Sequence, residues 1–182
     1  MRSDKDRVRK AGTELLGRIE RVMAQADWPG LLDLVDMLPR VPRVFVSGAG
    51  RSGLVARSFG MRLMHAGLTA YIPGETVTPA IHEGDLLVAI SMTGRTGYTV
   101  YLVERAKGLG AKVVVLTAEP ESPLARLADK VVVIPAADED IVIRAAVFEH
   151  AASLGLDAAF NVLAEFLKLD LDSFRQHHAN LE

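Results

Sequence analysis

The stretch Val44-Phe-Val-Ser-Gly-Ala-Gly-Arg-Ser-Gly53 decides the fold, because it joins a buried strand to a helix through a glycine-rich loop. Its first three residues form an apolar run without alternation, as in strands that are buried on both faces of a sheet. From Ser52 to Ala66 the apolar residues recur at helical spacing. The stretch therefore predicts a strand followed by a helix, which is the repeating unit of an open parallel sheet.

The alternation of strands and helices continues as far as residue 134. Further apolar runs predict four more strands, at Leu68–Ile72, Asp85–Ile90, Lys112–Thr117 and Lys130–Ile134. Between them, helical patterns are predicted over 96–109, before the stop signal Gly110, and over 122–128. Alternation of this kind predicts an open parallel sheet wound by right-handed crossovers.

Both ends of the chain are predicted to be helical. The first forty residues hold one helix through Val22 and a second over 31–38, separated by a break at Asp27–Gly30. A long apolar helical pattern covers 144–168, where Gly155 marks a point of interruption, and a short helix follows over 171–178. A helix that is apolar on most sides is deeply buried or part of a subunit interface, so we do not expect a monomer.

The composition is that of a single globular domain. Apolar residues make up 49% of the 182 residues, so residues 1–182 are expected to form one domain, with N-terminal helices over 1–40, an αβ core over 43–135 and C-terminal helices over 141–182. The net charge of −2 argues against nucleic-acid binding, and the absence of cysteine excludes thiol catalysis and Cys-ligated metals. No apolar stretch approaches the length of about 20 residues that a membrane span needs, and no signal peptide is visible, so we expect a cytoplasmic protein without a membrane partner.

Two loops with unusual chemistry follow two of the predicted strands. Ser47–Gly53 supplies glycines and a helix start, and Ser91–Gly97 supplies three hydroxyls, a glycine and the cation of Arg95. Ligands of open parallel sheets bind at the carboxyl ends of the strands, and helix N-termini attract anions. Together the loops predict a phosphate site. The alternative is that the serines and threonines only cap the helices.

The first loop also matches the dinucleotide fingerprint G-x-G-x-x-G through Gly48, Gly50 and Gly53. That fingerprint calls for an acidic residue at the end of the next strand, and Glu75 lies near there, but after Pro73-Gly74. A dinucleotide site has no use for the hydroxyl-rich second loop. We therefore rank it below a phosphosugar site.

Several segments carry a resemblance to a known family. They are Gly48–Gly53 with Met61–Gly67, Gly74–Pro79, Asp85–Leu87 leading into the second loop, Phe148-Glu149, and the tail His178–Glu182. With these segments, which extend over nearly the whole chain, the sequence resembles the SIS (sugar isomerase) domain family and, within it, the 6-phospho-3-hexuloisomerases.

The resemblance implies a fold, a reaction and an assembly. The fold is an α/β three-layer αβα sandwich with a five-stranded parallel sheet, wound as in flavodoxin, with extra helices at both ends. The reaction interconverts 3-hexulose 6-phosphate and fructose 6-phosphate, after formaldehyde fixation onto ribulose 5-phosphate in the ribulose monophosphate pathway, or in reverse to supply pentose. The implied assembly is a homo-oligomer, either a dimer or a tetramer, with active sites near subunit interfaces. The resemblance implies neither a cofactor nor a metal.

The resemblance also assigns residues. The phosphate-binding positions of the family fall on Ser52 in the first loop, and on Ser91, Thr93 and Thr96 in the second. Its acid-base positions fall on Glu149 and His65. We add Gly50, Arg51 and Arg95 as candidates for substrate binding, because they lie in these loops. Glu75, in the segment Gly74–Pro79, is a further candidate, which either binds sugar hydroxyls or caps the next turn.

The chemistry of the reaction suits the two acid-base candidates. Moving a carbonyl from C3 to C2 removes the proton on C2 and delivers one to C3 through an enediol, which one partly buried carboxylate can do. A neutral imidazole can move protons between the two oxygens. Two other interpretations remain open: Glu149 as an ion-pair partner of Arg144, one turn away, and His65 as a packed histidine beside Met64.

Some positions depart from the family pattern. Met92 stands in the second loop where the family favours glycine, and Ile143–Ala145 replaces a common Pro-Met-Gly. These changes leave open an isomerase of another sugar phosphate. A phosphosugar-binding module without catalysis is a further alternative, although the chain length leaves no room for an output domain.

Overall fold

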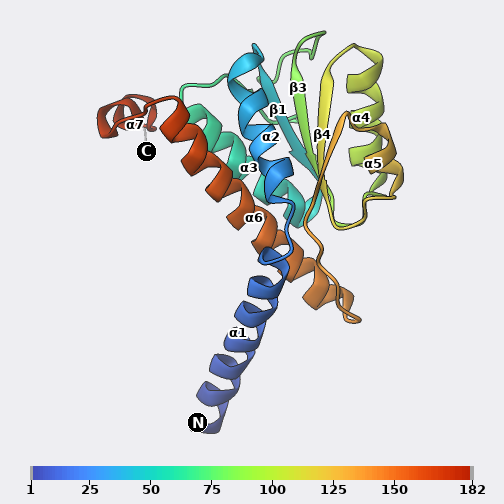
Figure 1. Ribbon diagram of the computed structural model, residues 1–182, viewed down its shortest axis with the longest axis vertical. Helices are drawn as coiled ribbons and strands as arrows, with labels where there is room; N and C mark the ends of the chain where they lie inside the picture. The colour runs from blue at the N-terminus through green and yellow to red at the C-terminus, as the bar shows by residue number, and fades with distance from the viewer. Residues whose placement is uncertain (1, 181–182) are drawn as a thin grey trace.

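The structure is a computed structural model that describes residues 2–180 and shows a parallel sheet between two layers of helices (Figure 1). The strands are β1 (Val44–Gly48), β2 (Ala70–Tyr71), β3 (Leu86–Ile90), β4 (Lys112–Thr117) and β5 (Lys130–Val133). The five-stranded sheet has the order β2-β1-β3-β4-β5, and every neighbouring pair is parallel. The predicted α/β fold with flavodoxin-like winding is therefore confirmed.

The strand order brings the two predicted loops together. The chain moves from β1 outward to β2 and then returns to β3 on the other side of β1, which makes the β1–β3 pair the switch point of the sheet. In the parallel register Gly48 lies opposite Ile90, so the two strands end side by side. The loops that follow β1 and β3 therefore start from neighbouring positions on one edge.

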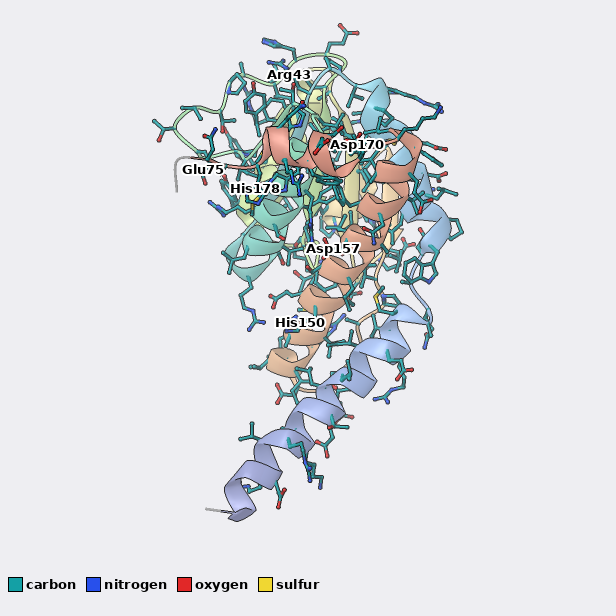
Figure 2. The ribbon with its side chains drawn as sticks, turned by 90° about the vertical axis from the view of Figure 1, so that its left-hand side faces the viewer. Arg43, Glu75, His150, Asp157, Asp170 and His178 are labelled. Carbon is teal, nitrogen blue, oxygen red and sulfur yellow. The ribbon has the colours of Figure 1, made fainter. Side chains whose placement is uncertain are left out.

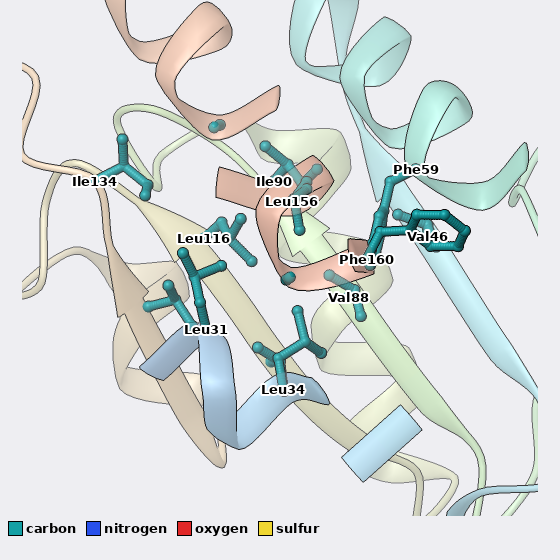
Figure 3. Packing of buried hydrophobic residues seen from close by; sticks show 14 of the residues in the cluster. Leu31, Leu34, Val46, Phe59, Val88, Ile90, Leu116, Ile134, Leu156 and Phe160 are labelled. Carbon is teal, nitrogen blue, oxygen red and sulfur yellow. The ribbon is translucent and has the colours of Figure 1, made fainter. Parts of the chain in front are cut away.

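The helices form two layers. The larger core lies between the sheet and α2 (Trp28–Met37), α3 (Gly50–His65) and α6 (Ile141–Phe166), where side chains such as Leu34, Phe59 and Leu156 meet Val88 of β3 (Figure 3). On the opposite face, a smaller core joins the sheet to α4 (Gly97–Gly108) and α5 (Pro123–Leu127). Burial on both faces explains the unbroken apolar runs of the central strands.

The long C-terminal helix corrects one prediction. α6 runs without a break through Gly155, whose missing side chain leaves room for Leu31: a Cβ there would lie 3.2 Å from the Leu31 Cδ1. Gly155 therefore allows α2 to approach α6 closely and does not interrupt the helix. α6 also packs against α1 (Arg2–Met23), which projects away from the sheet, and against α3. None of the helices in the described part of the chain is long and apolar enough to cross a membrane.

Two further boundaries differ from the prediction. The predicted break between the first two helices exists but lies over 24–27, because Trp28, Pro29 and Gly30 already form the first turn of α2. The Asp27 side chain caps that turn by accepting a hydrogen bond from the Gly30 N–H at 2.9 Å. The strand predicted over 68–72 shrinks to two residues at the edge of the sheet, where it has one neighbour. A 3-10 turn, η1 (Leu38–Arg40), and a terminal helix, α7 (Leu171–His177), complete the fold.

Candidate active site

The loop after β1 is compact because its glycines lie against neighbouring backbone. A Cβ on Gly48 would come within 2.8 Å of the Ser52 backbone and 2.9 Å of the Ile90 carbonyl oxygen. Gly50 begins α3 with φ +57°, a conformation that favours glycine. The predicted glycines are thus required for the tight passage of this loop beside the end of β3.

The loop after β3 holds its hydroxyls close together. Ser91 is buried, with 3% of its surface exposed, and its Oγ lies 3.4 Å from the Oγ1 of Thr96. Thr93 Oγ1 accepts a hydrogen bond of 3.4 Å from the Arg95 N–H, and the Arg95 residue is exposed. Gly94 has φ +59°, and a Cβ there would overlap the Ser122 hydroxyl.

Helix capping does not account for these hydroxyls. Thr96 is the N-cap residue of α4, yet its side chain makes no capping hydrogen bond, and the N-cap of α3 is Ala49, which has no capping group. The first turns of both helices therefore present N–H groups that side chains do not cap, at the edge where β1 and β3 end. Such groups are suited to bind an anion.

Met92 does not fill the loop with its bulk. Its side chain packs against the larger core, while its carbonyl accepts hydrogen bonds from the Ala118 N–H and the Thr117 Oγ1, both at 3.0 Å. The departure from glycine is therefore accommodated beneath the loop.

Thr99 is a polar residue that sequence analysis missed. It lies in the first turn of α4, is completely buried, and its Oγ1 has no hydrogen-bond partner among the described residues. A buried hydroxyl without a partner is costly, and it stands close in sequence to the hydroxyl-rich loop. A threonine inside a helical pattern carries no signal that would have revealed it.

Glu149 lies on α6 and faces the start of α3. Its Oε2 is 2.5 Å from the Arg51 Nε, and 11% of its side chain is exposed, against 59% for Arg51. The contact is close but poorly aligned, so Oε2 is a buried oxygen without a well-formed hydrogen bond. The pairing of Glu149 with Arg144 that we considered is wrong, because Arg144 binds Glu119 and donates to the Ala136 carbonyl at 2.9 Å.

A shallow pocket opens beside this ion pair. It is lined by residues of α3 and α6, namely Arg51, Leu54, Val55, Ser58, Glu149, His150 and Ser153. Glu149 is thus reached from the pocket, and through Arg51 it is adjacent to the glycine-rich loop.

His65 lies at the opposite end of α3. It follows Arg51 by fourteen residues, which corresponds to roughly 21 Å along the helix axis. Its ring stacks on that of His178, with centroids 5.0 Å apart and an angle of 10° between the planes. Burial lowers the pKa of His65, and the nearby His178 and Arg62 lower it further. A single chain therefore does not bring the two predicted acid-base residues together.

The remaining candidates occupy separate positions. Glu75 pairs with Arg57 at 3.0 Å, with both side chains about half exposed, so it does not cap a turn with its carboxylate. His82 is exposed. Among the described residues, no group of three or more His, Cys, Asp or Glu side chains is placed to hold a metal ion.

Comparisons with known proteins identify the class of this protein. Residues 37–157 match the model of the SIS domain, so the chain belongs to the SIS domain family, as the resemblance implied. A protein of Mycobacterium gastri called 3-hexulose-6-phosphate isomerase is 44% identical over 147 residues, covering 77% of this chain and 74% of that protein. One of Bacillus subtilis with the same name is 39% identical over 157 residues, covering 82% and 85%.

A solved structure agrees with these sequences. The hypothetical protein MJ1247 from Methanococcus jannaschii has a TM-score of 0.82 to this chain at 29% identity, covering 93% of this chain and 96% of that one. Its description infers a molecular function of 3-hexulose-6-phosphate isomerase.

Proposed function

We propose that this protein is an isomerase that interconverts 3-hexulose 6-phosphate and fructose 6-phosphate. The observation that carries the proposal is Glu149, a nearly buried carboxylate that faces a pocket beside the glycine-rich loop and keeps one oxygen without a well-formed hydrogen bond. The names of the relatives from Mycobacterium gastri and Bacillus subtilis support the choice of substrate.

Glu149 is the proposed base. It takes the proton from C2 of the sugar and delivers a proton to C3, with an enediol between the two steps. Its carboxylate is nearly enclosed, which restricts its contact with water, and the Arg51 guanidinium lies beside it. Positive charge at that point stabilises negative charge that develops on the substrate oxygens.

The phosphate of the substrate is the proposed anchor. We assign it to the switch point, where Ser52, Ser91, Thr93 and Thr96 meet the first turns of α3 and α4. The phosphate itself does not react. Its binding energy holds the reacting carbons against Glu149.

We assign the completion of the site to a second copy of the chain. His65, the proposed proton carrier between O2 and O3, is too far along α3 from Arg51 to share a site with Glu149 of its own chain. Exposed leucines lie at this pocket and beside it: Leu54 of α3 lines the pocket that holds Glu149, and Leu16 of α1 and Leu154 of α6 line the neighbouring pocket, which shares His150 and Ser153 with it. An apolar rim of this kind favours a subunit interface, and hence a homo-oligomer, dimer or tetramer.

The reaction defines the place of the enzyme in metabolism. Its ketose substrate carries the carbonyl at C3. Such a ketose is the product of adding formaldehyde to C1 of ribulose 5-phosphate. The proposed enzyme therefore works in the ribulose monophosphate pathway of the cytoplasm, in either direction.

A coupled assay tests the proposal. Purified protein is given enzymatically generated 3-hexulose 6-phosphate without nucleotide or added metal, and formation of fructose 6-phosphate is followed. We expect turnover that Glu149→Gln abolishes, with sugar-phosphate binding kept within about tenfold, because an amide cannot accept the proton. Glu165→Gln, an exposed position on the same helix, is the matched control and keeps full turnover.

Other outcomes would contradict the proposal in distinct ways. Near-normal turnover in Glu149→Gln would show that Glu149 is not the base. No turnover, with thermal stabilisation by several sugar phosphates, would indicate another substrate or a binding module. Tighter binding of NAD than of sugar phosphate would favour the dinucleotide site.

A further inference from the structure

The C-terminal tail reaches the same end of α3 as His65. The ring of His178, the residue after α7, stacks on the His65 imidazole with centroids 5.0 Å apart and planes within 10° of parallel. In Figure 2, His178 lies below α7, well separated along α6 from His150, the sequence neighbour of Glu149. The stack therefore belongs to the histidine end of α3 and not to the pocket of its own chain.

Several contacts hold the tail in this place. The His178 N–H donates to the Phe174 carbonyl at 3.1 Å, and the Phe174 ring packs edge-on against Phe160 of α6 with centroids 5.9 Å apart. The His177 ring lies against Gly67, where a Cβ would come within 3.4 Å of it, and Gly67 has φ +77°. The positive φ favours glycine in this turn after α3, and the tail lies in direct contact with it.

We infer that His178 is a positioning residue for His65, and that the tail is thereby part of the active site to which this His65 contributes. This inference rests on the proposed function, in which His65 carries protons between the substrate oxygens. Stacking restricts the rotation of the His65 ring about χ2 and covers one of its faces. A proton carrier must keep a fixed ring orientation, since a displacement of about 1 Å can cost a hundredfold in rate.

The charged groups around His65 favour the neutral form of its imidazole. The groups that face it are Arg62, one turn earlier on α3, and His177 and His178 of the tail, while Asp157 of α6 is already paired with Arg62 at 3.1 Å. Burial is the largest cause that lowers the pKa of His65, followed by His178. The covering ring therefore favours the neutral imidazole, which can both donate and accept a proton.

Two substitutions at position 178 distinguish stacking on His65 from a direct action of the His178 ring nitrogens. His178→Phe keeps a flat ring but no titrating group, and His178→Ala removes the ring; His82→Ala, at an exposed histidine in a turn, is the control. The kinetic parameters kcat and KM are measured from pH 5.5 to 8.5, and the titration of the His65 imidazole is followed by NMR. Because His178 is exposed, all variants are expected to fold, which circular dichroism checks.

We expect His178→Ala to lower kcat about tenfold with KM within about twofold, since the substrate is still anchored but the proton carrier is mobile. Its NMR midpoint rises, and the acidic limb of the pH profile moves to higher pH, because protonated His65 cannot accept a proton. His178→Phe recovers kcat to within about threefold of the wild type, because the cover is kept.

Two results would overturn the inference. One is a His178→Ala variant with unchanged kcat, pH profile and His65 midpoint. The other is an equal loss in His178→Ala and His178→Phe, which would mean that the ring nitrogens of His178 act on the substrate. If the wild type has no isomerase activity, the proposed function fails, and the NMR midpoint alone decides whether His178 controls His65.

Discussion

The Nε of Arg51 lies 2.5 Å from the Oε2 of Glu149, so the first turn of α3 is joined to α6 by a charged contact. The carboxylate is the more buried partner, and the cation offsets the cost of removing its charge from water. Because Arg51 also belongs to the glycine-rich loop, one residue links the proposed base to the proposed phosphate site. From the sequence, Arg51 was expected to serve the phosphate.

The two roles of Arg51 predict different kinetics. If Arg51 acts on Glu149 and the reacting oxygens, Arg51→Met lowers kcat by about 10- to 100-fold, with a smaller change in KM, because charge stabilisation in the transition state is lost. Arg51→Lys, which keeps the charge, recovers part of this loss. Steady-state kinetics decide, with Arg126→Met, an exposed arginine on α5, as the control. A raised KM with unchanged kcat would restrict Arg51 to phosphate binding.

The hydroxyls of the second loop predict an effect on affinity. Ser91→Ala combined with Thr96→Val removes the pair of oxygens that lie 3.4 Å apart, and we expect sugar-phosphate affinity to fall about tenfold or more, as for the loss of hydrogen bonds to a charged group. Isothermal titration with fructose 6-phosphate measures this fall, and Thr13→Val, an exposed threonine of α1, is the control. An unchanged affinity would mean that the phosphate binds elsewhere.

Local features were predictable from the sequence, and contacts between distant segments were not. The strands and the two loops are encoded in short runs of residues, whose apolar and glycine patterns act within a few positions. An interruption at Gly155 was wrongly predicted, because this glycine makes room for Leu31, which belongs to another helix. Likewise, the partner of Glu149 and the stack of His65 on His178 depend on how α3, α6 and the tail pack.

The glycine of the second loop predicts a loss of stability. Gly94→Ala places a side chain at φ +59° and against Ser122, so we expect the free energy of unfolding to fall by more than about 1 kcal/mol, together with weaker phosphate binding. Gly97→Ala is the matched control, since it lies in the same segment, at the start of α4, with open space around its Cβ. Urea unfolding compares the two. Equal stabilities would show that the loop rearranges freely around position 94.

The lowered pKa of His65 predicts a pH dependence of stability. Below its ordinary value of 6.5, the unfolded chain binds a proton at this histidine more readily than the folded chain does, so the free energy of unfolding decreases as the pH falls through that range. The carboxyls of Asp129 and Asp170, whose pKa values are lowered from 3.8, affect stability only in more acidic solution. Melting temperatures at pH 7.5 and 5.5 should differ less in His65→Gln than in the wild type. An identical difference in both proteins would contradict this prediction.

Sharing of the site between two copies predicts rescue in mixed oligomers. If Glu149 comes from one chain and His65 from another, a dimer of a Glu149→Gln chain and a His65→Ala chain holds one site with both residues intact. Random mixing makes half of the dimers mixed, so co-expression of the two inactive variants should restore about a quarter of wild-type activity. Differently tagged chains allow the mixed species to be purified and assayed.

A second pair of variants makes this test specific. Arg51 and Glu149 contact each other within one chain, so mixing Glu149→Gln with Arg51→Met leaves every site with one defect. That mixture should stay at the level of its parents, because no combination of chains rebuilds the ion pair together with the base. Rescue of the Glu149→Gln chain by the His65→Ala chain, but not by the Arg51→Met chain, would show that the two ends of α3 belong to different active sites. If purified mixed oligomers regain no activity, His65 has no role in the reaction.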